Sequence, residues 1–421
     1  MMLRRELLKA SAAAAGLSVL PIGARGWAAS NPQEATRRLV VVFLRGAVDG
    51  LNLVVPHSEP AYYAARPTIA IPRPGQTGGA LDLDGRFGLH PALAPLQPFW
   101  RERSLAFIHA AGSPDPTRSH FDAQDYMESG TPGRKSTPDG WMNRLLGQLP
   151  GPHSSTSAVA FGPTVPRMLS GRLAVANIPT GRAANRPMAI DRPLLNAAFD
   201  QLYAGHDDMS LAYKEGVRTR AKLVADLQED MKEADNGAPS PVGFSTDTEH
   251  LAALVAKDPA VELAFFDLGG WDTHVSEGSS EGQLAGHLKP LAEGLAVLAK
   301  GLGAQYRDTV IVVLSEFGRT VHENGNRGTD HGHGNVLWVM GGPVKGGRVY
   351  GDWPGLEEAA LYQNRDLAIT TDFRSALSVV LSRHMRLGRR ALATVFPGAP
   401  PAPAAVAGLI GIKHSAKTKG I

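Results

Sequence analysis

The sequence predicts an α/β fold in which a mostly parallel central sheet is flanked by helices. Short runs rich in β-branched residues are apolar on both faces, as in strands buried within a parallel sheet that helices cover. Helical patterns lie between these runs, and strand–helix–strand alternation favours a parallel sheet. The predicted strands are residues 39–44, 105–109, 158–161, 261–268, 309–314 and 336–340.

The clearest predicted helix carries one apolar stripe, because its leucines recur at alternating steps of four and three. These are Leu284, Leu288, Leu291, Leu295, Leu298 and Leu302. Residues 196–234 predict one long helix or a helical pair that ends in a polar, proline-containing break at 235–241.

The N-terminus resembles a twin-arginine (Tat) export signal. Arg4-Arg5 precedes a small, apolar run at 10–19, which is too short to span a bilayer, and Gly26-Trp27-Ala28 fits a cleavage site. Leu3 stands where the usual pattern has Ser or Thr. The pattern predicts a signal peptide at 1–28 and a periplasmic or extracellular protein exported by the Tat machinery; the alternative is an ordinary basic tail.

Composition limits the classes of function. The formal charge of +3 equals the excess of four basic residues over one acidic residue in 1–28, so the rest of the chain is close to neutral. A neutral protein offers no electrostatic case for binding nucleic acid. No later stretch is long and apolar enough for an integral membrane span. The absence of cysteine excludes thiolate metal ligands and a cysteine nucleophile.

The roughly 390 residues after the leader fit one large α/β domain or two smaller ones. We predict a single domain over 29–412, with a helical insertion at about 190–258 and a flexible tail at 413–421.

Reactive side chains gather next to the predicted strands. Ligands of open α/β sheets bind beyond the carboxyl ends of the strands, so residues just after a strand are candidates for a site. Candidates that follow strands are Asp49, Ser119, His120, Asp272, His274 and Glu316, whereas Asp330, His331 and His333 precede the last one and could fold back over the same edge.

Carboxylates and imidazoles bind divalent metals when no thiolate is available. In an extended segment, residues i and i+2 point to the same side, so Asp272 and His274 converge, and the 330–333 segment has the same alternation. The alternative is two polar, solvated loops. Zinc, manganese, magnesium and calcium all remain open as the metal.

Ser119 has two interpretations. It is a helix N-cap, or it is a nucleophile at a helix N-terminus, where free N–H groups favour an alkoxide or a bound oxyanion. His120 is either a metal ligand or a polar partner on the first turn of that helix.

Six motifs occur in a characteristic order: Phe-Leu-Arg-Gly (43–46), Asp-Gly-Leu-Asn (49–52), Arg-Ser-His-Phe (118–121), Gly-Trp-Asp-Thr-His (270–274), Leu-Ser-Glu-Phe-Gly-Arg-Thr (314–320) and Thr-Asp-His-Gly-His-Gly-Asn (329–335). With the leader, they resemble the exported bacterial family labelled domain of unknown function 1501. That family is similar in layout to the alkaline phosphatase and sulfatase superfamily, which implies an alkaline-phosphatase-like fold.

The resemblance also implies roles for individual residues. Asp49 would match the first metal-binding Asp, Ser119 the nucleophile, Asp272 and His274 the middle pair, Glu316 a later Asp, and His331 or His333 the final His. Phe317 departs from the superfamily, which has a histidine there, so one ligand is lost unless His331 and His333 both bind.

The sequence therefore predicts a metal-dependent hydrolase of phosphate or sulfate esters, acting on a small-molecule or polysaccharide ester. Arg118, Arg45 and Arg319 are candidate clamps for the anion, because a guanidinium contacts two oxygens at once. Arg319 is preferred, because it follows Glu316 at the same predicted strand end. Two alternatives remain: a hydrolase that uses bound water with Ser119 only a cap, and a non-catalytic cell-envelope binding protein that keeps an oxyanion or metal pocket.

Overall fold

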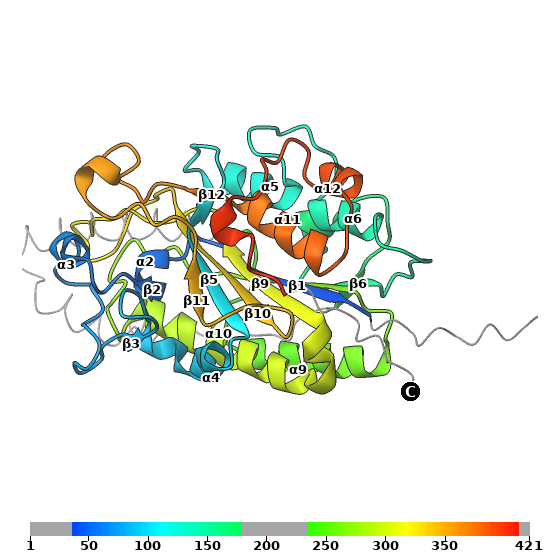
Figure 1. The fold of residues 1–421 in the computed structure, drawn as a ribbon, viewed down its shortest axis with the longest axis horizontal. Coiled ribbons are helices and arrows are strands. Elements are labelled where there is room, and N and C mark those ends of the chain that lie inside the picture. Colours follow the sequence, from blue (N-terminus) through cyan, green and yellow to red (C-terminus); the bar gives the residue numbers. More distant parts are fainter. Residues whose placement is uncertain (1–35, 179–233, 412–421) are drawn as a thin grey trace, which may run out of the picture. The chain divides into compact units, whose positions relative to one another are not determined.

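The computed structural model describes residues 36–178 and 234–411, and the described residues from Arg37 onward form one compact unit (Figure 1). The predicted leader at 1–28, residues 190–233 of the predicted insertion and the predicted tail at 413–421 lie outside the described residues. Within the described part, no helix combines the length and apolar character needed to cross a membrane.

A single large sheet forms the centre of the unit. Its order is β11-β5-β10-β9-β1-β8-β6-β7, with β12 beside β5. Only β10 is antiparallel to its neighbours, β5 and β9, so the prediction of a mostly parallel sheet is confirmed. The strands are β1 (Arg38–Leu44), β5 (Leu105–Gly112), β6 (Ala158–Phe161), β7 (Ala176–Ile178), β8 (Leu263–Leu268), β9 (Thr309–Ser315), β10 (Asn335–Gly341), β11 (Arg348–Tyr350) and β12 (Thr371–Asp372).

All six predicted runs are strands, with shifts only at their ends. The run at 105–109 continues to Gly112, and the run at 261–268 begins at Leu263. A separate small sheet, β2-β4-β3, was not predicted, because its strands, β2 (Val54–Val55), β3 (Leu81–Asp82) and β4 (Gly88–Leu89), are too short to show a period.

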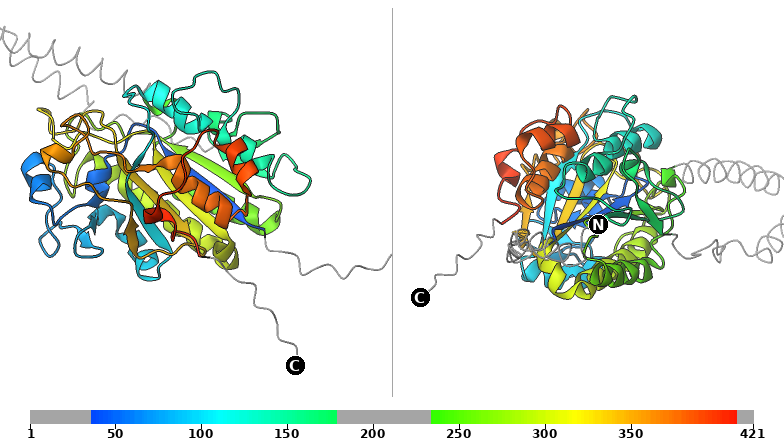
Figure 2. Two further views of the ribbon diagram at one scale, coloured as in Figure 1. Left: turned by 45° about the horizontal axis from the view of Figure 1, so that its top comes forward. Right: turned by 90° about the vertical axis from the view of Figure 1, so that its right-hand side faces the viewer.

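Helices cover both faces of the large sheet (Figures 1 and 2). On one face lie α5 (His120–Ser129), α6 (Trp141–Leu146), α11 (Phe373–Arg383) and α12 (Arg389–Val395); on the other lie α4 (Gln97–Arg101), α9 (Phe244–Lys257) and α10 (Gln283–Gly301). Two short helices, α2 (Gly50–Leu53) and α3 (Pro60–Ala65), follow β1.

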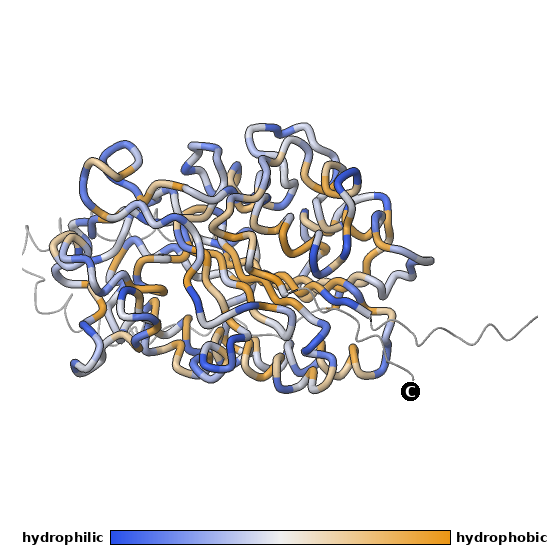
Figure 3. Tube along the Cα trace, in the orientation of Figure 1, coloured by the Kyte–Doolittle hydropathy of each residue, from blue (hydrophilic) through white to orange (hydrophobic). Residues whose placement is uncertain are grey.

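The apolar strands hold these layers together. In β1, Val40 and Val42 pack with α9 and α10, whereas Leu39, Val41 and Phe43 pack with the helices of the opposite face. Both faces of the strand are therefore buried, which explains its unbroken apolar run, and Figure 3 shows the same apolar centre along the sheet. The predicted leucine stripe is buried on α10 against this sheet.

Strand direction decides which loops meet. The strands β1, β8 and β9 are adjacent and parallel, so the segments that follow them leave the same edge of the sheet. Because β10 runs the opposite way, the chain must return to that edge before β10 begins at Asn335. The loops after residues 44, 268 and 315 and the loop before residue 335 therefore share one edge.

Candidate metal centre

Three side chains from distant segments converge at this edge. His120 opens α5, Asp272 follows β8, and His331 lies on the return to β10. Their ligand atoms all lie within 4.8 Å of one another. His120 Nε2 lies 2.9 Å from His331 Nε2, and Asp272 Oδ1 lies 3.6 Å from the first and 3.4 Å from the second.

His274 adjoins this group. Its Nε2 lies 2.9 Å from His331 Nε2 and 3.0 Å from Asp272 Oδ1. Two residues after Asp272 in the loop that follows β8, it reaches the same carboxylate oxygen, as the i, i+2 alternation predicted. The group of four is called the His₃Asp cluster below.

The outer ring nitrogen of each histidine faces an acceptor. His331 Nδ1 donates to the backbone carbonyl of Arg118 (2.9 Å), His120 Nδ1 lies 2.8 Å from Glu316 Oε1, and His274 Nδ1 lies 3.5 Å from Asp330 Oδ1. A carbonyl cannot donate, so the His331 proton is on Nδ1. Metal-binding histidines are held in this way, with the proton directed outward and the Nε2 lone pair inward.

Protonation of the cluster follows from this geometry. Burial opposes a charge on His120, but hydrogen bonds to Asp272 and Glu316 outweigh it and raise the pKa of His120 to about 9. Burial lowers the pKa of His331, whereas hydrogen bonds from the three histidines overcome burial and hold the pKa of Asp272 well below its usual range. A carboxylate and three facing lone pairs favour a cation, and a proton on His120 supplies one when no metal does.

Glu316 fixes His120 from behind. Its carboxylate is fully buried and accepts from His120 Nδ1, Gly46 N (2.8 Å) and Gln124 Nε2 (3.0 Å). Burial would raise the pKa of Glu316, but the hydrogen bond and charge of His120 lower it to about 2. Glu316 is therefore ionised and only accepts, so His120 Nδ1 carries the proton. Gly46 has φ +113° and a Cβ there would lie 2.7 Å from Asp272 N, so only glycine fits.

The cluster fits a divalent metal. Asp272 Oδ2 is buried and has no hydrogen-bond partner in the part of the chain that the structure describes. Zn–N bonds of about 2.0–2.1 Å put the ligand atoms of a tetrahedral site about 3.3–3.4 Å apart. The separations of 2.9–3.6 Å seen here bracket that spacing. Three imidazoles and a carboxylate are typical ligands of zinc.

Some predicted site residues lie elsewhere. Asp49 is fully buried, caps α2 and pairs with Arg66, and its pKa is lowered because that guanidinium outweighs burial. His333 stacks on Tyr362 with ring centroids 4.2 Å apart, which turns it out of the cluster. The Asp330 side chain lies 3.5 Å from His274 Nδ1, at the outside of the cluster, and is 57% exposed.

Neither Arg319 nor Arg45 is free for an anion. Arg319 is 1% exposed and donates to the carbonyls of Gly46, Ala47, Trp271 and Thr329 and, at 2.5 Å, to Asp272 Oδ1. Arg45 is also buried, and it bonds to Gln124, Glu128 and Asp267. Both guanidiniums hold the loops around the site together.

Ser119 and Arg118 lie at the surface beside the cluster. Ser119 is exposed and caps α5, accepting weakly from Asp122 N at 3.5 Å. The Arg118 side chain is 29% exposed and pairs with Asp366 at 2.6 Å. Phe317 is buried between Ala47 and Ala123, and its ring lies beside those of His120 and His331, so it forms a wall of the site.

Asp235 belongs to this neighbourhood, although it was not among the predicted site residues. Its Oδ1 accepts from Gly270 N at 2.6 Å, and Gly269 leaves room for the carboxyl group. Burial and then the charges of Asp272 and Glu316 raise the pKa of Asp235 to about 7. The residue lies in the polar break after 196–234, where only the paired glycines at 269–270 hinted at a close neighbour.

Several solved structures are similar in fold at low identity. One is Ps i-CgsB in complex with k-i-k-neocarrahexaose (10% identity, 75% of this chain and 68% of that chain, TM-score 0.39). Another is the C-terminal periplasmic domain of EcEptC from Escherichia coli in complex with Zn (10%, 73% and 73%, TM-score 0.35). A third is a protein in the alkaline phosphatase superfamily from Vibrio parahaemolyticus (10%, 73% and 61%, TM-score 0.36). All three scores are below 0.5, so the likeness says nothing about activity.

No curated protein matches the chain. The sequence profile of one family matches residues 105–396, a span that contains His120, Asp272, His274, Glu316 and His331. The chain therefore belongs to the family described as protein of unknown function (DUF1501).

Proposed function

We propose that the protein is a metal-dependent hydrolase of phosphate or sulfate esters, with His120, Asp272, His331 and His274 as the metal ligands. One observation carries the proposal: the Nε2 atoms of three histidines and a carboxylate oxygen converge, while each Nδ1 faces an outer acceptor. Zinc suits this donor set best, because three of the four ligands are imidazoles.

The chemistry requires a polarised anion and an activated oxygen nucleophile. A divalent metal bound here would supply both by acting as a Lewis acid and lowering the pKa of a bound hydroxyl or water. Glu316 keeps the His120 proton on Nδ1, and the Arg118 carbonyl does the same for His331. These contacts keep both lone pairs directed at the metal position.

Ser119 is the proposed nucleophile. Its hydroxyl is exposed and immediately precedes His120, whose side chain enters the cluster. The first turn of α5 leaves backbone N–H groups without helical partners, which favours an oxyanion at this point. Arg118 replaces Arg319 as the proposed clamp. Asp366 and Gln363 hold its Nε and Nη2, but its Nη1 has no hydrogen bond among the described residues and the side chain is 29% exposed.

A non-catalytic binding protein is the second candidate. Arg319 and Arg45 could have neutralised the charge of a transferring group, but both guanidiniums pair with carboxylates inside the protein. Phe317, which carries no metal-binding atom, lies beside the cluster. Such a site would still bind metal and an oxyanion, but without turnover.

Metal analysis of the purified protein, followed by assays on phosphate and sulfate esters, tests the proposal. We expect close to one equivalent of metal and metal-dependent turnover. Ser119→Thr keeps both hydroxyl and cap, whereas Ser119→Asn keeps only the cap. Loss of turnover in Ser119→Asn alone supports the nucleophile; equal turnover in both variants assigns attack to water. Metal without turnover of any ester favours the binding protein, and a folded protein that takes up no metal refutes both.

Export by the Tat pathway remains a proposal that rests on Arg4-Arg5. Replacing both arginines by lysine should leave the full-length protein in the cytoplasmic fraction, whereas an unchanged distribution between fractions would contradict Tat export.

A further inference from the structure

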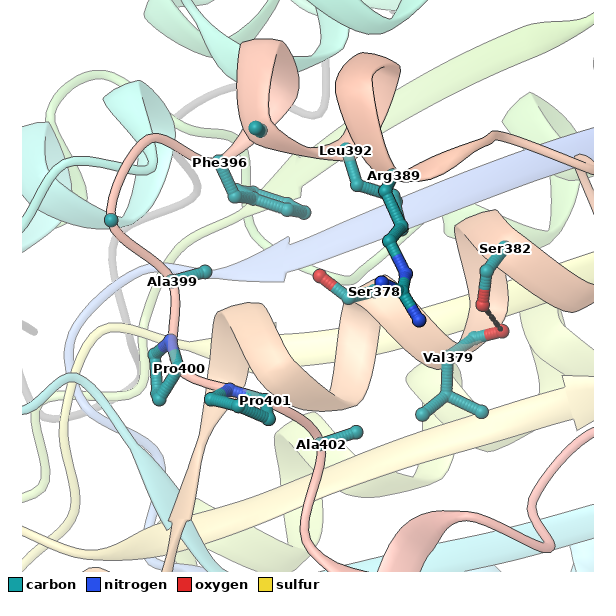
Figure 4. Close-up of a pocket in the computed structure, with 12 residues that line it drawn as sticks. Ser378, Val379, Ser382, Arg389, Leu392, Phe396, Ala399, Pro400, Pro401 and Ala402 are labelled. Carbon is teal, nitrogen blue, oxygen red and sulfur yellow. Dashed lines mark hydrogen bonds between the residues drawn. The ribbon is translucent and has the colours of Figure 1, made fainter.

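A hollow separate from the His₃Asp cluster is lined by α11, α12 and the segment that follows α12. Its volume is about 420 Å³, within the roughly 300–1,000 Å³ typical of small-molecule sites. Figure 4 shows it between the two helices and the segment that follows α12. Its lining residues are Ser378, Val379, Ser382, Arg389, Leu392, Ala393, Phe396 and Gly398 to Ala402. None of them belongs to the His₃Asp cluster.

The walls of this hollow are apolar and fixed. Phe396 is 1% exposed, and its ring packs on Trp141 with centroids 5.1 Å apart and on Phe373 at 6.3 Å. It therefore has no freedom to swing into the space. Pro400 and Pro401 form a stiff opposite wall, since each ring fixes its backbone φ. Small side chains between these walls leave the space open.

The hollow has one positively charged side chain in its lining, Arg389. Arg389 is its only charged lining residue, and across residues 36–178 and 234–411 its guanidinium has no hydrogen bond or ion pair. Figure 4 shows this side chain reaching from α12 across the hollow toward Ser378. The Ser378 hydroxyl likewise has no hydrogen bond within those ranges, whereas Ser382 Oγ donates to the Val379 carbonyl at 3.2 Å.

We propose that this hollow is a binding site for a single-chain amphiphile whose carboxylate pairs with Arg389 and whose apolar chain lies against Leu392, Phe396 and Val379. Charge complementarity selects the head group, because an unpaired guanidinium binds a carboxylate through two parallel hydrogen bonds. The apolar walls select the tail, since contact with them removes hydrocarbon from water. Among the described residues, no acidic side chain lines the hollow, which disfavours a cationic ligand.

Calorimetric titration with monomeric laurate tests the site, and dodecyltrimethylammonium provides the same chain with the opposite charge. We expect saturable binding of one laurate and none of the cation. Arg389→Gln should weaken laurate binding at least about tenfold, the lower end for a hydrogen bond to a charged group. Arg390→Gln is the matched control: it is exposed on the same helix, does not line the hollow and should change the affinity less than twofold.

Ala393→Trp supplies an independent test, because this exposed lining position can take a large side chain without repacking the core. We expect it to abolish binding while the circular dichroism spectrum is kept. The proposal is overturned if laurate binding does not saturate, or if laurate and dodecyltrimethylammonium bind with equal affinity. It is also overturned if Arg390→Gln lowers the affinity for laurate as much as Arg389→Gln does, or if the protein binds vesicles of anionic lipid but not monomeric laurate.

Discussion

Replacing His331 by alanine should remove most of the affinity for metal. The His331 Nε2 lies within 3.4 Å of the ligand atoms of His120, His274 and Asp272, so it is the centre of the His₃Asp cluster. The apparent binding free energy of zinc at a four-ligand structural site is about 10–16 kcal/mol, or roughly 3 kcal/mol per ligand if it is shared equally. At about 1.4 kcal/mol per tenfold, the loss is about a hundredfold in Kd.

His333→Ala is the matched control for this substitution. The two histidines are separated only by Gly332, but His333 stacks on Tyr362 and contacts no atom of the cluster among the described residues. Zinc titrated calorimetrically into the metal-stripped protein should bind to His333→Ala as it does to the unaltered chain. Equal zinc affinity in His331→Ala and His333→Ala, with both folded by circular dichroism, would refute the cluster as the metal site.

Three further substitutions separate the roles of buried charges. Glu316→Gln should weaken zinc about 10–100-fold, because it removes the anion that orients His120, and the same titration measures the loss. Glu277 is fully buried, and its carboxyl group accepts from Asn52, Thr273 and Thr329. Burial and then the charge of Asp49 raise the pKa of Glu277 to about 8, so the folded state favours its neutral form. A stabilisation of about 5 kcal/mol should therefore be present below about pH 4.5 and lost as pH rises through 8. Glu277→Gln should flatten this pH dependence of the free energy of unfolding, measured by urea unfolding at a series of pH values. Arg319→Lys should lower the free energy of unfolding, measured in the same urea experiment, by about 3–5 kcal/mol, because buried carbonyls and Asp272 lose their hydrogen-bond partner. A free energy of unfolding within about 1 kcal/mol of the unaltered chain would contradict this structural role and fit a side chain free to clamp an anion.

The sequence revealed six strands of the large sheet, because both faces of each are buried, which leaves an unbroken apolar run. It did not reveal β7, β11 and β12, which are short and partly exposed. The sequence did not reveal that β10 is antiparallel to its neighbours, because the apolar pattern of a strand does not depend on its direction in the sheet. Its direction nevertheless matters for the site, because it returns His331 to the edge where Asp272 and His274 lie.

Side-chain partners were harder to predict than strands. Asp272 and His274 converge because local alternation in one loop determines their direction. The environments of three other residues depend on segments that are distant in the sequence. Asp49 pairs with Arg66, and Arg319 donates to four backbone carbonyls. Asp235 accepts a hydrogen bond from the backbone of Gly270. No pattern within one segment encodes such partners.

The His₃Asp cluster joins parts of the chain that are remote in sequence. His120 and His331 are 211 positions apart, and His274 and His331 are 57 apart. A cation shared among them would act as a reversible cross-link in a chain that has no cysteine for a disulfide. By the chain-entropy model, closing a loop of about 100 residues is worth roughly 4–5 kcal/mol, and the larger loop here exceeds that length. A chelator would then do to this protein what a reductant does to a secreted one: open its longest loop and hasten unfolding.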